Sequence, residues 1–383
     1  MNRSKKTIFI IILLLLGLFF IPGAPAGAAE TKPGDVNGDG AVCVSDAILV
    51  LQDVVGIRSL SAGERERADL NGNGKVDVSD AIRILRIIVG LDGYSFRGVS
   101  MGDTEADVLR ILGEPARKDL SKYGFEWYIY NQDYDNYIQM GIKEGRVVGI
   151  YTNAGRWKMN GGIRPGSTCE ELKVQYGDPL DGIKKGNVNY LFSEAQKEQV
   201  FVCLIDEEYY AYFFLDKFNE GKVTAVQLID KTVEEGMMTW YPIPSDALRT
   251  AFERQSMDLA NAIRARNKKP PFQWCERARS AARKHSEDMA LHNYFDHKNK
   301  QGEEPADRMT KEGILWSSCG ENIAAGQTSA IMAHEGWMNS AGHRSIILGE
   351  GDNIPGDFSH VGVGVAFGGE HQIYYTQNFY TPQ

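Results

Sequence analysis

Two copies of an acidic twelve-residue loop constrain this chain more than any other feature of its sequence. The copies run from Asp35 to Asp46 and from Asp69 to Asp80, a shift of 69 − 35 = 34 residues. Each copy has side-chain oxygens at positions 1, 3, 5 and 12, glycine at position 6 and a backbone carbonyl at position 7, which is the pattern of a calcium loop. The predicted calcium ligands are Asp35, Asn37, Asp39, Ala41 and Asp46 in the first loop, and Asp69, Asn71, Asn73, Lys75, Asp77 and Asp80 in the second.

Oxygen ligands without nitrogen suit a hard cation, so the sequence predicts two bound Ca²⁺ ions. We expect a helix directly after each loop, over residues 47–55 and 81–89, and no helix leading in. The Ser-Asp pair that ends each loop stands where an N-cap belongs, so the last ligand would also start the helix. Val42 and Val76, one on each loop, are expected to meet in a small shared core.

Residues 32–92 resemble the type I dockerin in these repeated motifs. The resemblance implies a small all-α domain that binds two calcium ions and takes a cohesin domain of a scaffoldin as its partner. It also implies that loop positions 10 and 11 contact this partner, and these positions are Val44, Ser45, Val78 and Ser79. Because the two copies are nearly identical, docking is expected in either of two orientations.

The N-terminus has the three-part layout of a secretory signal peptide. Basic residues precede an apolar run over residues 8–21 and the small-residue sequence Ala26-Gly27-Ala28. The run is shorter than the roughly 20 residues that a spanning helix needs. We therefore expect residues 1–28 to be removed and the mature chain to be secreted without a membrane span, and an uncleaved anchor is the alternative. The formal net charge of −9 argues against a nucleic-acid partner.

The five cysteines are too scattered for a disulfide scaffold, and none of them forms a CxxC pair. Cys169 with Cys203, and Cys275 with Cys319, could bridge within a domain. Buried free thiols are the alternative that we favour, because sequence alone does not establish the geometry of a bridge.

Residues 95–240 contain a second duplication. Gly102-Asp-Thr104 recurs as Gly166-Ser-Thr168, an offset of 166 − 102 = 64 residues. Each threonine suits a helix N-cap, and alternating apolar stretches downstream predict antiparallel strands. We expect a duplicated α+β module with a helix and a small sheet in each copy, and it resembles the module found N-terminal to bacterial domains of the class considered next. Its strand aromatics are expected in a core, and a peptide- or glycan-binding sheet face is the alternative.

The pattern changes again over residues 246–381. Helices are expected over 246–266 and 276–291, followed by strands over 361–365 and 373–379. The motifs Gly-Glu-Asn-Ile at residues 320–323 and Ser-Ala-Gly-His-Arg at residues 340–344 resemble the bacterial branch of the CAP superfamily (SCP/PR-1-like).

The CAP resemblance implies an α-β-α sandwich with a cleft lined by His297, Glu321 and His343. Two imidazoles and a carboxylate could hold zinc and leave a coordination position open. Where the family has a second cleft glutamate, shortly after the tryptophan at Trp337, this chain has Ser340, and Glu335 is carried only as a substitute. Another departure is Ile346, which replaces the family's asparagine after His-Arg-x.

Three functions follow for this multi-domain chain. The first makes the C-terminal domain a non-enzymatic binding module for a peptide, lipid or cell-wall ligand, which the dockerin carries to a cellulosome-type scaffold at or near the cell surface. We favour it because the sequence shows no nucleophile and base motif. The second is a metal-assisted, peptidase-like hydrolase with zinc on His297 and His343 and with Glu321 as the base. The third is an accessory role in polysaccharide degradation, which rests on association with other dockerin bearers.

Overall fold

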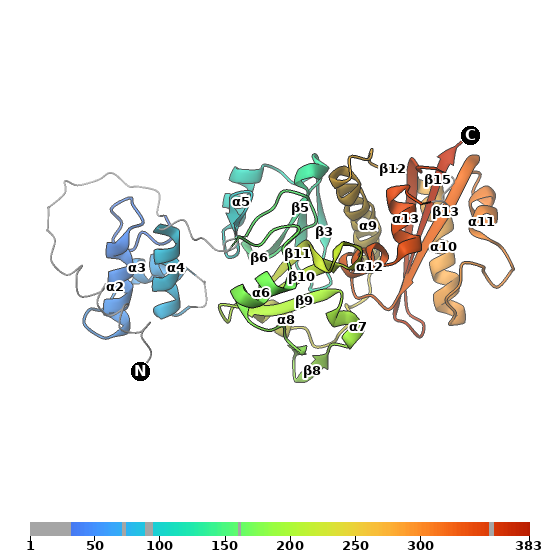
Figure 1. Ribbon diagram of the computed structural model, residues 1–383. Coiled ribbons are helices and arrows are strands. Elements are labelled where there is room, and N and C mark those ends of the chain that lie inside the picture. Colours follow the sequence, from blue (N-terminus) through green and yellow to red (C-terminus); the bar gives the residue numbers. More distant parts are fainter. Residues whose placement is uncertain (1–31, 71–73, 89–94, 160–161, 352–355) are drawn as a thin grey trace. The chain divides into compact units, whose positions relative to one another are not determined.

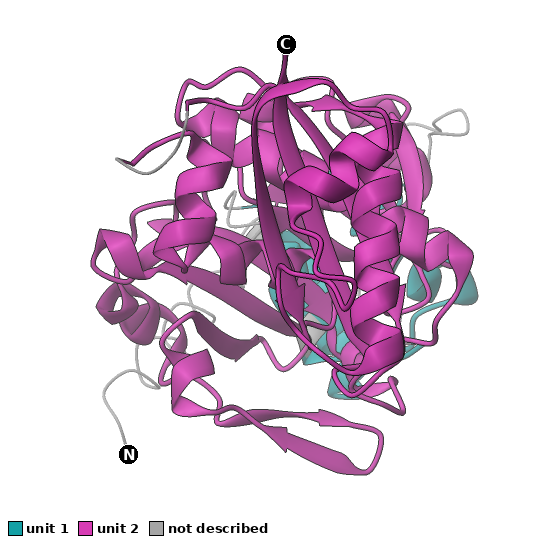
Figure 2. Ribbon diagram, turned by 90° about the vertical axis from the view of Figure 1, so that its right-hand side faces the viewer, with its two compact units in different colours: residues 1–91 teal, residues 92–383 magenta. Residues whose placement is uncertain are grey.

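The computed structural model describes residues 32–70, 74–88, 95–159, 162–351 and 356–383. Its contacts divide the chain into two compact units, Met1–Leu91 and Asp92–Gln383 (Figure 2). Each unit is described by itself below. None of the helices in the described ranges combines the length and apolar character that are needed to span a bilayer.

The first unit consists of short helices around a small core (Figure 1). The helices are α2 (Val44–Val54), α3 (Ala62–Ala68) and α4 (Val78–Ile88). α2 packs against α4, and the core between them is formed by Val36, Ala47, Val50, Leu60, Ala68, Ala81 and Ile84. Val42 and Val76 both pack against this cluster, in agreement with the shared core that the sequence predicts.

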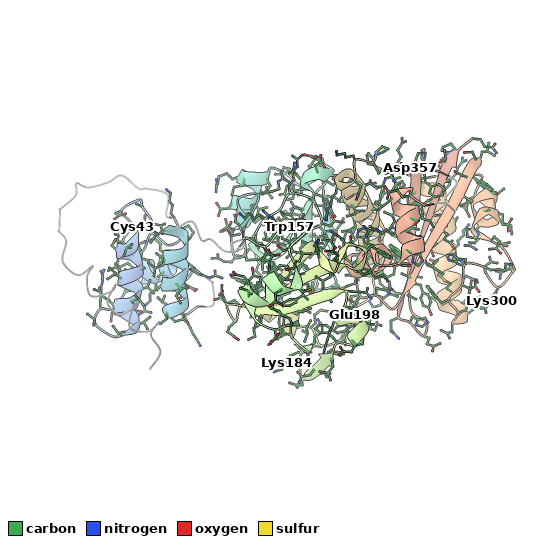
Figure 3. The ribbon with its side chains drawn as sticks, in the orientation of Figure 1. Cys43, Trp157, Lys184, Glu198, Lys300 and Asp357 are labelled. Carbon is green, nitrogen blue, oxygen red and sulfur yellow. The ribbon has the colours of Figure 1, made fainter. Side chains whose placement is uncertain are left out.

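The helices of the first unit begin earlier than the sequence predicted. α2 starts at Val44 with Cys43 (Figure 3) as its N-cap residue, so Asp46 lies inside the first turn. From there Asp46 Oδ2 accepts a hydrogen bond from the Cys43 backbone N–H at 2.9 Å, which stabilises the helix N-terminus. The prediction that no helix leads into the loops is wrong for the second loop, because α3 ends directly before Asp69.

The first half of the second unit contains one seven-stranded antiparallel sheet rather than two separate small sheets. Its strands are β3 (Arg117–Leu120), β4 (Glu126–Tyr130), β5 (Ile138–Lys143), β6 (Arg146–Thr152), β9 (Val200–Ile205), β10 (Tyr209–Asp216) and β11 (Lys222–Asp230). Their order is β3-β4-β5-β6-β11-β10-β9. β6 of the first copy pairs with β11 of the second, with Thr152 opposite Val226, so the duplicated copies share one continuous sheet.

The duplication is visible in matching contacts. The helices α5 (Glu105–Leu112) and α6 (Cys169–Tyr176) start at Thr104 and Thr168, whose hydroxyls cap them as predicted. The Gly102 N–H donates to the Val147 carbonyl and the Gly166 N–H to the Val223 carbonyl, both at 2.8 Å. The offset of 64 at the glycines has grown to 223 − 147 = 76 at the last strand, so the second copy has 76 − 64 = 12 additional residues.

Short elements complete this module. They are β1 (Ser95–Phe96), β2 (Val99–Ser100), η1 (Tyr134–Asn136), β7 (Gly182–Lys185), β8 (Val188–Leu191), α7 (Glu194–Lys197), η3 (Lys217–Asn219) and α8 (Lys231–Glu235). β7 and β8 form a separate antiparallel hairpin. The additional residues of the second copy fall in the stretch that contains this hairpin and α7.

The C-terminal domain is a four-stranded sheet between helices. The strands are β12 (Gln273–Trp274), β13 (Trp316–Ala325), β14 (His360–Phe367) and β15 (Ile373–Pro382), in the order β12-β14-β15-β13. The helices are α9 (Asp246–Arg266), α10 (Glu276–His292), α11 (Pro305–Lys311), α12 (Ala330–Met338) and α13 (Ala341–Leu348). All five cysteines are free thiols, in agreement with the alternative that we favoured.

The two faces of this sheet meet different helices. On one face α10 approaches β14 so closely that a Cβ added at Gly362 would lie 2.0 Å from the backbone nitrogen of Arg279. On the other face, Val361, Val363 and Val365 enter the main core together with side chains of α9 and α12. The resulting layers are helix, sheet and helix.

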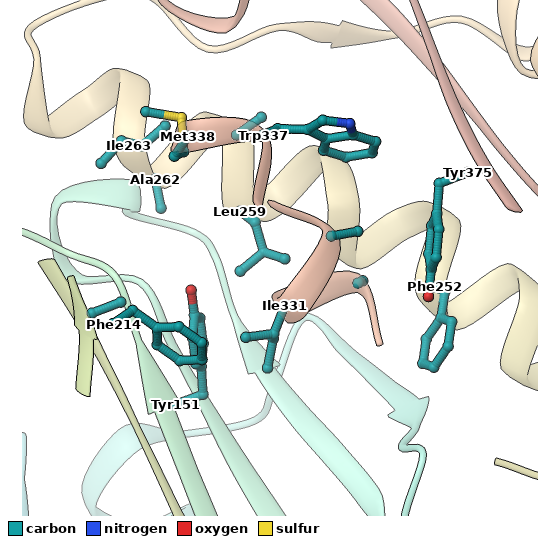
Figure 4. Close-up of a cluster of buried hydrophobic side chains, with 14 of the residues drawn as sticks. Tyr151, Phe214, Phe252, Leu259, Ala262, Ile263, Ile331, Trp337, Met338 and Tyr375 are labelled. Atoms are coloured by element: carbon teal, nitrogen blue, oxygen red, sulfur yellow. The ribbon is translucent and has the colours of Figure 1, made fainter. Parts of the chain in front are cut away.

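The same core continues into the seven-stranded sheet. Leu259 of α9 and Ile331 of α12 lie opposite Tyr151 and Phe214 of that sheet (Figure 4). The two aromatic rings pack edge to face, with their centroids 6.3 Å apart. The middle module and the C-terminal domain therefore share apolar burial within one compact unit.

Candidate functional sites

The first site consists of the two acidic loops, where backbone amides hold the carboxylates of positions 1 and 12. Asp35 accepts hydrogen bonds from the backbone N–H groups of Asp39 (3.0 Å) and Gly40 (2.8 Å). Asp46, which is fully buried, accepts one from Asn37 N–H at 3.1 Å. Two carboxylates from the ends of the loop are thus withdrawn from solvent, and a bound cation would offset the cost of burying them.

The second loop repeats these contacts. Asp69 Oδ2 accepts from Gly74 N–H at 2.8 Å, as Asp35 does from Gly40, and Asp80 Oδ2 accepts from Asp77 N–H at 3.0 Å. Gly40 and Gly74 have φ values of +93° and +79°, a left-handed conformation that favours glycine at position 6. Asn71 and Asn73 lie outside the described residues.

The donor set of both loops is oxygen alone, which fits calcium. In the first loop Asn37 Oδ1 and Asp39 Oδ1 accept hydrogen bonds from within the loop. Ala41 and Lys75 occupy position 7, where the ligand is a backbone carbonyl. Across the described ranges, no three His, Cys, Asp or Glu side chains are clustered closely enough to hold a metal, so the loop carboxylates are oriented by backbone amides in this structure.

A repeated apolar surface lies just after each loop. Val44 and Ile48 on α2 are each 37% exposed, and Val78 and Ile82 on α4 are 48% and 46% exposed. Ser45 is also exposed, whereas the side chain of Ser79 is not described. The sequence analysis missed Ile48 and Ile82, although the 34-residue repeat marks them as an exposed apolar pair.

The second site centres on Glu321 of β13, a carboxylate with both oxygens engaged. Oε1 lies 2.9 Å from Nδ1 of His297, and Oε2 accepts a hydrogen bond from Nη2 of Arg308 at 2.5 Å. The hydrogen bond to Glu321 raises the pKa of His297. Arg308 also donates to the carbonyl oxygens of His297 and Glu303, both at 2.8 Å, and this fixes the guanidinium beside the carboxylate.

His343, at the start of α13, lies near this pair without a direct bond to it. Burial lowers the pKa of His343, and the charge of His297 lowers it further. The Nδ1 atom of His343 has no hydrogen-bond partner among the described residues. The structure thus brings His297 and Glu321 into contact with His343 nearby, but the three predicted zinc ligands do not form a metal-binding cluster. Arg308 was missed, because nothing in the sequence marks it as the partner of Glu321.

Glu335 lies in a different place. Its Oε1 accepts a hydrogen bond at 2.9 Å from the hydroxyl of Tyr151, which belongs to the middle module. Burial raises the pKa of Glu335 to about 7. It lines a cavity whose described lining includes none of His297, Glu321 and His343. Ser340 is the N-cap residue of α13, and Ile346 packs against the main core.

Fold and sites together define an extracellular-type modular protein with a calcium-loop domain and a helix-sheet-helix domain. Family models match in the predicted order: the dockerin type I domain over residues 33–88, the CAP-associated N-terminal module over 101–240 and the cysteine-rich secretory protein (CAP) family over 257–379. The chain belongs to the CAP family and carries a type I dockerin domain.

Two relatives come from Bacillus subtilis (strain 168). The uncharacterized membrane protein YlbC is 32% identical over 300 residues, which cover 73% of this chain and 82% of that protein. The uncharacterized protein YkwD is 38% identical over 130 residues, which cover 34% of this chain and 47% of that protein.

Solved structures agree on the fold of the second unit. An extracellular protein containing a SCP domain from Bacillus anthracis str. Ames is 27% identical, with a TM-score of 0.62 and coverage of 73% of this chain and 93% of that chain. A cysteine-rich secretory protein from Staphylococcus aureus subsp. aureus Mu50, 15% identical with a TM-score of 0.60, covers 76% and 94% and shows the fold alone. The dockerin and CAP domains together point to a secreted docking protein with a CAP module.

Proposed function

We propose that this chain is secreted, docks through its calcium-loaded dockerin onto a cohesin domain of a scaffoldin, and presents its CAP domain as a binding module for a peptide, lipid or cell-wall ligand. The observation that carries the docking proposal is the exposed apolar pair Val44 and Ile48, repeated by Val78 and Ile82. Apolar side chains on one helix face are suited to anchor a protein partner.

Calcium has a defined place in this proposal. The side-chain oxygens at positions 1, 3, 5 and 12 and the carbonyl at position 7 would hold one ion in each loop, and Asp77 would contribute at position 9 of the second loop. Each ion supplies positive charge to carboxylates that only backbone amides are seen to hold in the first loop. Because position 12 lies in the first turn of α2 and of α4, ion binding stabilises the helices that carry the apolar pairs.

The docking proposal is tested by calorimetry with a panel of type I cohesins, in calcium and in chelator. We expect binding in calcium only. The double variant Ile48→Ala/Ile82→Ala should weaken binding by about tenfold or more, since central apolar anchors carry most of an interface's energy. If docking uses either orientation, each single variant should cost much less than the double.

The matched control is Ile57→Ala, because Ile57 is 76% exposed and is not one of the two repeated pairs. It should bind as the wild type does. Binding that persists in chelator, or no binding to any cohesin, would contradict the docking proposal.

For the CAP domain, the contacts of Glu321 favour binding over hydrolysis. A carboxylate that accepts a hydrogen bond from Arg308 and contacts His297 has both oxygens occupied, which does not suit a general base for water. Zinc analysis of the protein beside His297→Ala and His343→Ala, with peptide and glycan libraries as substrates, tests this. We expect no zinc above the level of the variants and no turnover. Stoichiometric zinc with turnover would instead support the hydrolase.

A further inference from the structure

A polar cavity of about 250 Å³ lies where the middle module meets the C-terminal domain inside the second unit. Its deep end is formed by Asn153, His334 and Glu335, which are 1%, 1% and 6% exposed. Its rim includes Phe218 after β10 and Asn267 after α9, both exposed. The cavity therefore leads from solvent to a buried polar end that neither proposed function uses.

The two arginines of this cavity differ in their partners. Arg344 makes a two-pronged ion pair with Asp216, at 2.9 and 3.0 Å. Arg266 donates instead to the backbone carbonyl (3.0 Å) and the hydroxyl (2.8 Å) of Thr224. In the described part of the chain, no carboxylate lies within salt-bridge distance of Arg266, so its charge is held in place without a counter-ion.

The cavity also holds a carboxyl group without a cation. Glu335 accepts a hydrogen bond from Tyr151, and no described lysine, arginine or histidine forms an ion pair with it. Arg266 is close enough to influence the Glu335 carboxyl electrostatically, but it forms no bond with it. A cationic site and an acidic site therefore lie in one small space, and each lacks a direct partner.

Two further polar atoms of the lining residues are unsatisfied. Asn153 Nδ2 lies 3.4 Å from His334 Nε2, so that ring nitrogen accepts and the proton belongs on Nδ1. His334 Nδ1 and Asn153 Oδ1 then remain as a donor and an acceptor without partners in the described residues. Buried polar atoms of this kind are uncommon in native proteins, and a bound ligand or water is one explanation for them.

We propose that this cavity binds a free α-amino acid with a small apolar side chain. Arg266 receives the carboxylate and Glu335 the ammonium group, while Ile263 and Met338 contact the side chain. A simple anion would meet Glu335 and Asp216, and a simple cation would meet both arginines, so a zwitterion satisfies the charges best. The volume is below the roughly 300–1,000 Å³ of pockets for drug-sized ligands, which favours a single amino acid over a peptide.

The test is isothermal titration of the full-length protein with L-alanine and L-valine. Propionate, which lacks the ammonium group, and isopropylamine, which lacks the carboxylate, serve as comparison ligands. We expect at least one amino acid to bind, and both analogues to bind about tenfold more weakly or worse, since each leaves one charged group of the cavity unpaired. No heat with either amino acid, or equal binding of propionate, would overturn the proposal.

Variants assign the two ends of the ligand. Arg266→Met and Glu335→Gln should each weaken L-alanine or L-valine binding by about tenfold or more. The matched controls Arg164→Met and Glu198→Gln change exposed residues outside the cavity and should bind as the wild type does (Glu198 is labelled in Figure 3). Unchanged affinity in both cavity variants would also overturn the proposal. The analogue comparison uses only the wild-type chain, so it decides even where a variant does not fold.

Discussion

Two glutamates of the C-terminal domain are equally buried but have different surroundings. Glu321 and Glu335 are each 6% exposed. Glu321 has a guanidinium partner, Arg308, at 2.5 Å, whereas Glu335 has the hydroxyl of Tyr151. A buried carboxylate loses its hydration, and only an opposite charge or several hydrogen bonds can offset that loss. The protein supplies the opposite charge in the first case and leaves it unsupplied in the second.

This difference separates a structural arrangement from an open one. Arg308 and His297 contact different oxygens of Glu321 and join residues from three consecutive segments of the domain. Glu335 is held by one bond across the junction of two modules, beside a cavity and an arginine without a counter-ion. We infer that the Glu321 cluster stabilises the domain, and that Glu335 is available for a ligand at a cost in stability. The predictions below examine this comparison.

Replacing Arg308 with methionine should have the largest effect. It leaves Glu321 buried without its cation, and breaking a buried ion pair in this way costs about 3–5 kcal/mol. All six tryptophans lie within residues 92–383, so tryptophan fluorescence during urea unfolding reports on the second unit. We expect the free energy of unfolding at pH 7 to fall by that amount in Arg308→Met.

Lys298→Met is the control for this loss. Lys298 forms an ion pair with Glu304 in which both side chains are about half exposed, 54% and 50%. Such surface pairs contribute about 0–1 kcal/mol. If Arg308→Met loses no more stability than Lys298→Met, the guanidinium does not stabilise Glu321 and the comparison fails.

Replacing Glu335 with glutamine should change the pH dependence of stability. Burial raises the pKa of Glu335 from about 4.5 to about 7. The folded protein then binds more protons than the unfolded chain between these values, so this group's contribution is present at low pH and is lost as the pH rises through 7. The stability of Glu335→Gln relative to the wild type should therefore grow by roughly 2–3 kcal/mol between pH 5 and pH 8.

The difference between variant and wild type is measured because His334 acts in the opposite direction. Burial lowers the pKa of His334 to about 3, so its contribution is lost as the pH falls below its ordinary value of 6.5. Over pH 5 to 6.5 the two slopes partly cancel in the wild type. The exposed replacement Glu198→Gln should show no comparable pH dependence. A constant difference between Glu335→Gln and the wild type would show that Glu335 is ionised in the folded state throughout.

Much of the fold could be predicted from local sequence signals. The helix predicted over residues 246–266 is α9 with the same bounds, and Thr104 and Thr168 cap their helices as expected. These features depend on neighbouring residues, such as a cap three residues from its partner. The start of α2 was predicted two to three residues late, because Asp46 acts in the first turn instead of at the N-cap.

Features that depend on long-range packing were not predicted. The pairing of β6 with β11 joins the two copies into one sheet, and nothing within either strand indicates which edge it meets. Likewise, the CAP resemblance identified Glu321 and His297, but Arg308 had no signal and Glu335 was assigned only as a substitute in the cleft. The middle module explains Glu335, since Tyr151 comes from 184 residues away in the chain.

Replacing Tyr151 with phenylalanine should have the smallest effect. The hydroxyl donates to Glu335, and its loss removes a hydrogen bond worth about 1 kcal/mol when the acceptor is neutral and about 1.5–3 kcal/mol when it is charged. The free energy of unfolding of Tyr151→Phe should therefore fall by about 1 kcal/mol at pH 5 and by somewhat more at pH 8. In a double-mutant cycle with Glu335→Gln, the coupling between the two residues should be larger at pH 8 than at pH 5, because only the carboxylate gains the charge-assisted bond. Equal coupling at the two pH values would mean that Glu335 does not change its charge beside Tyr151, and the contrast with Glu321 would then rest on geometry alone.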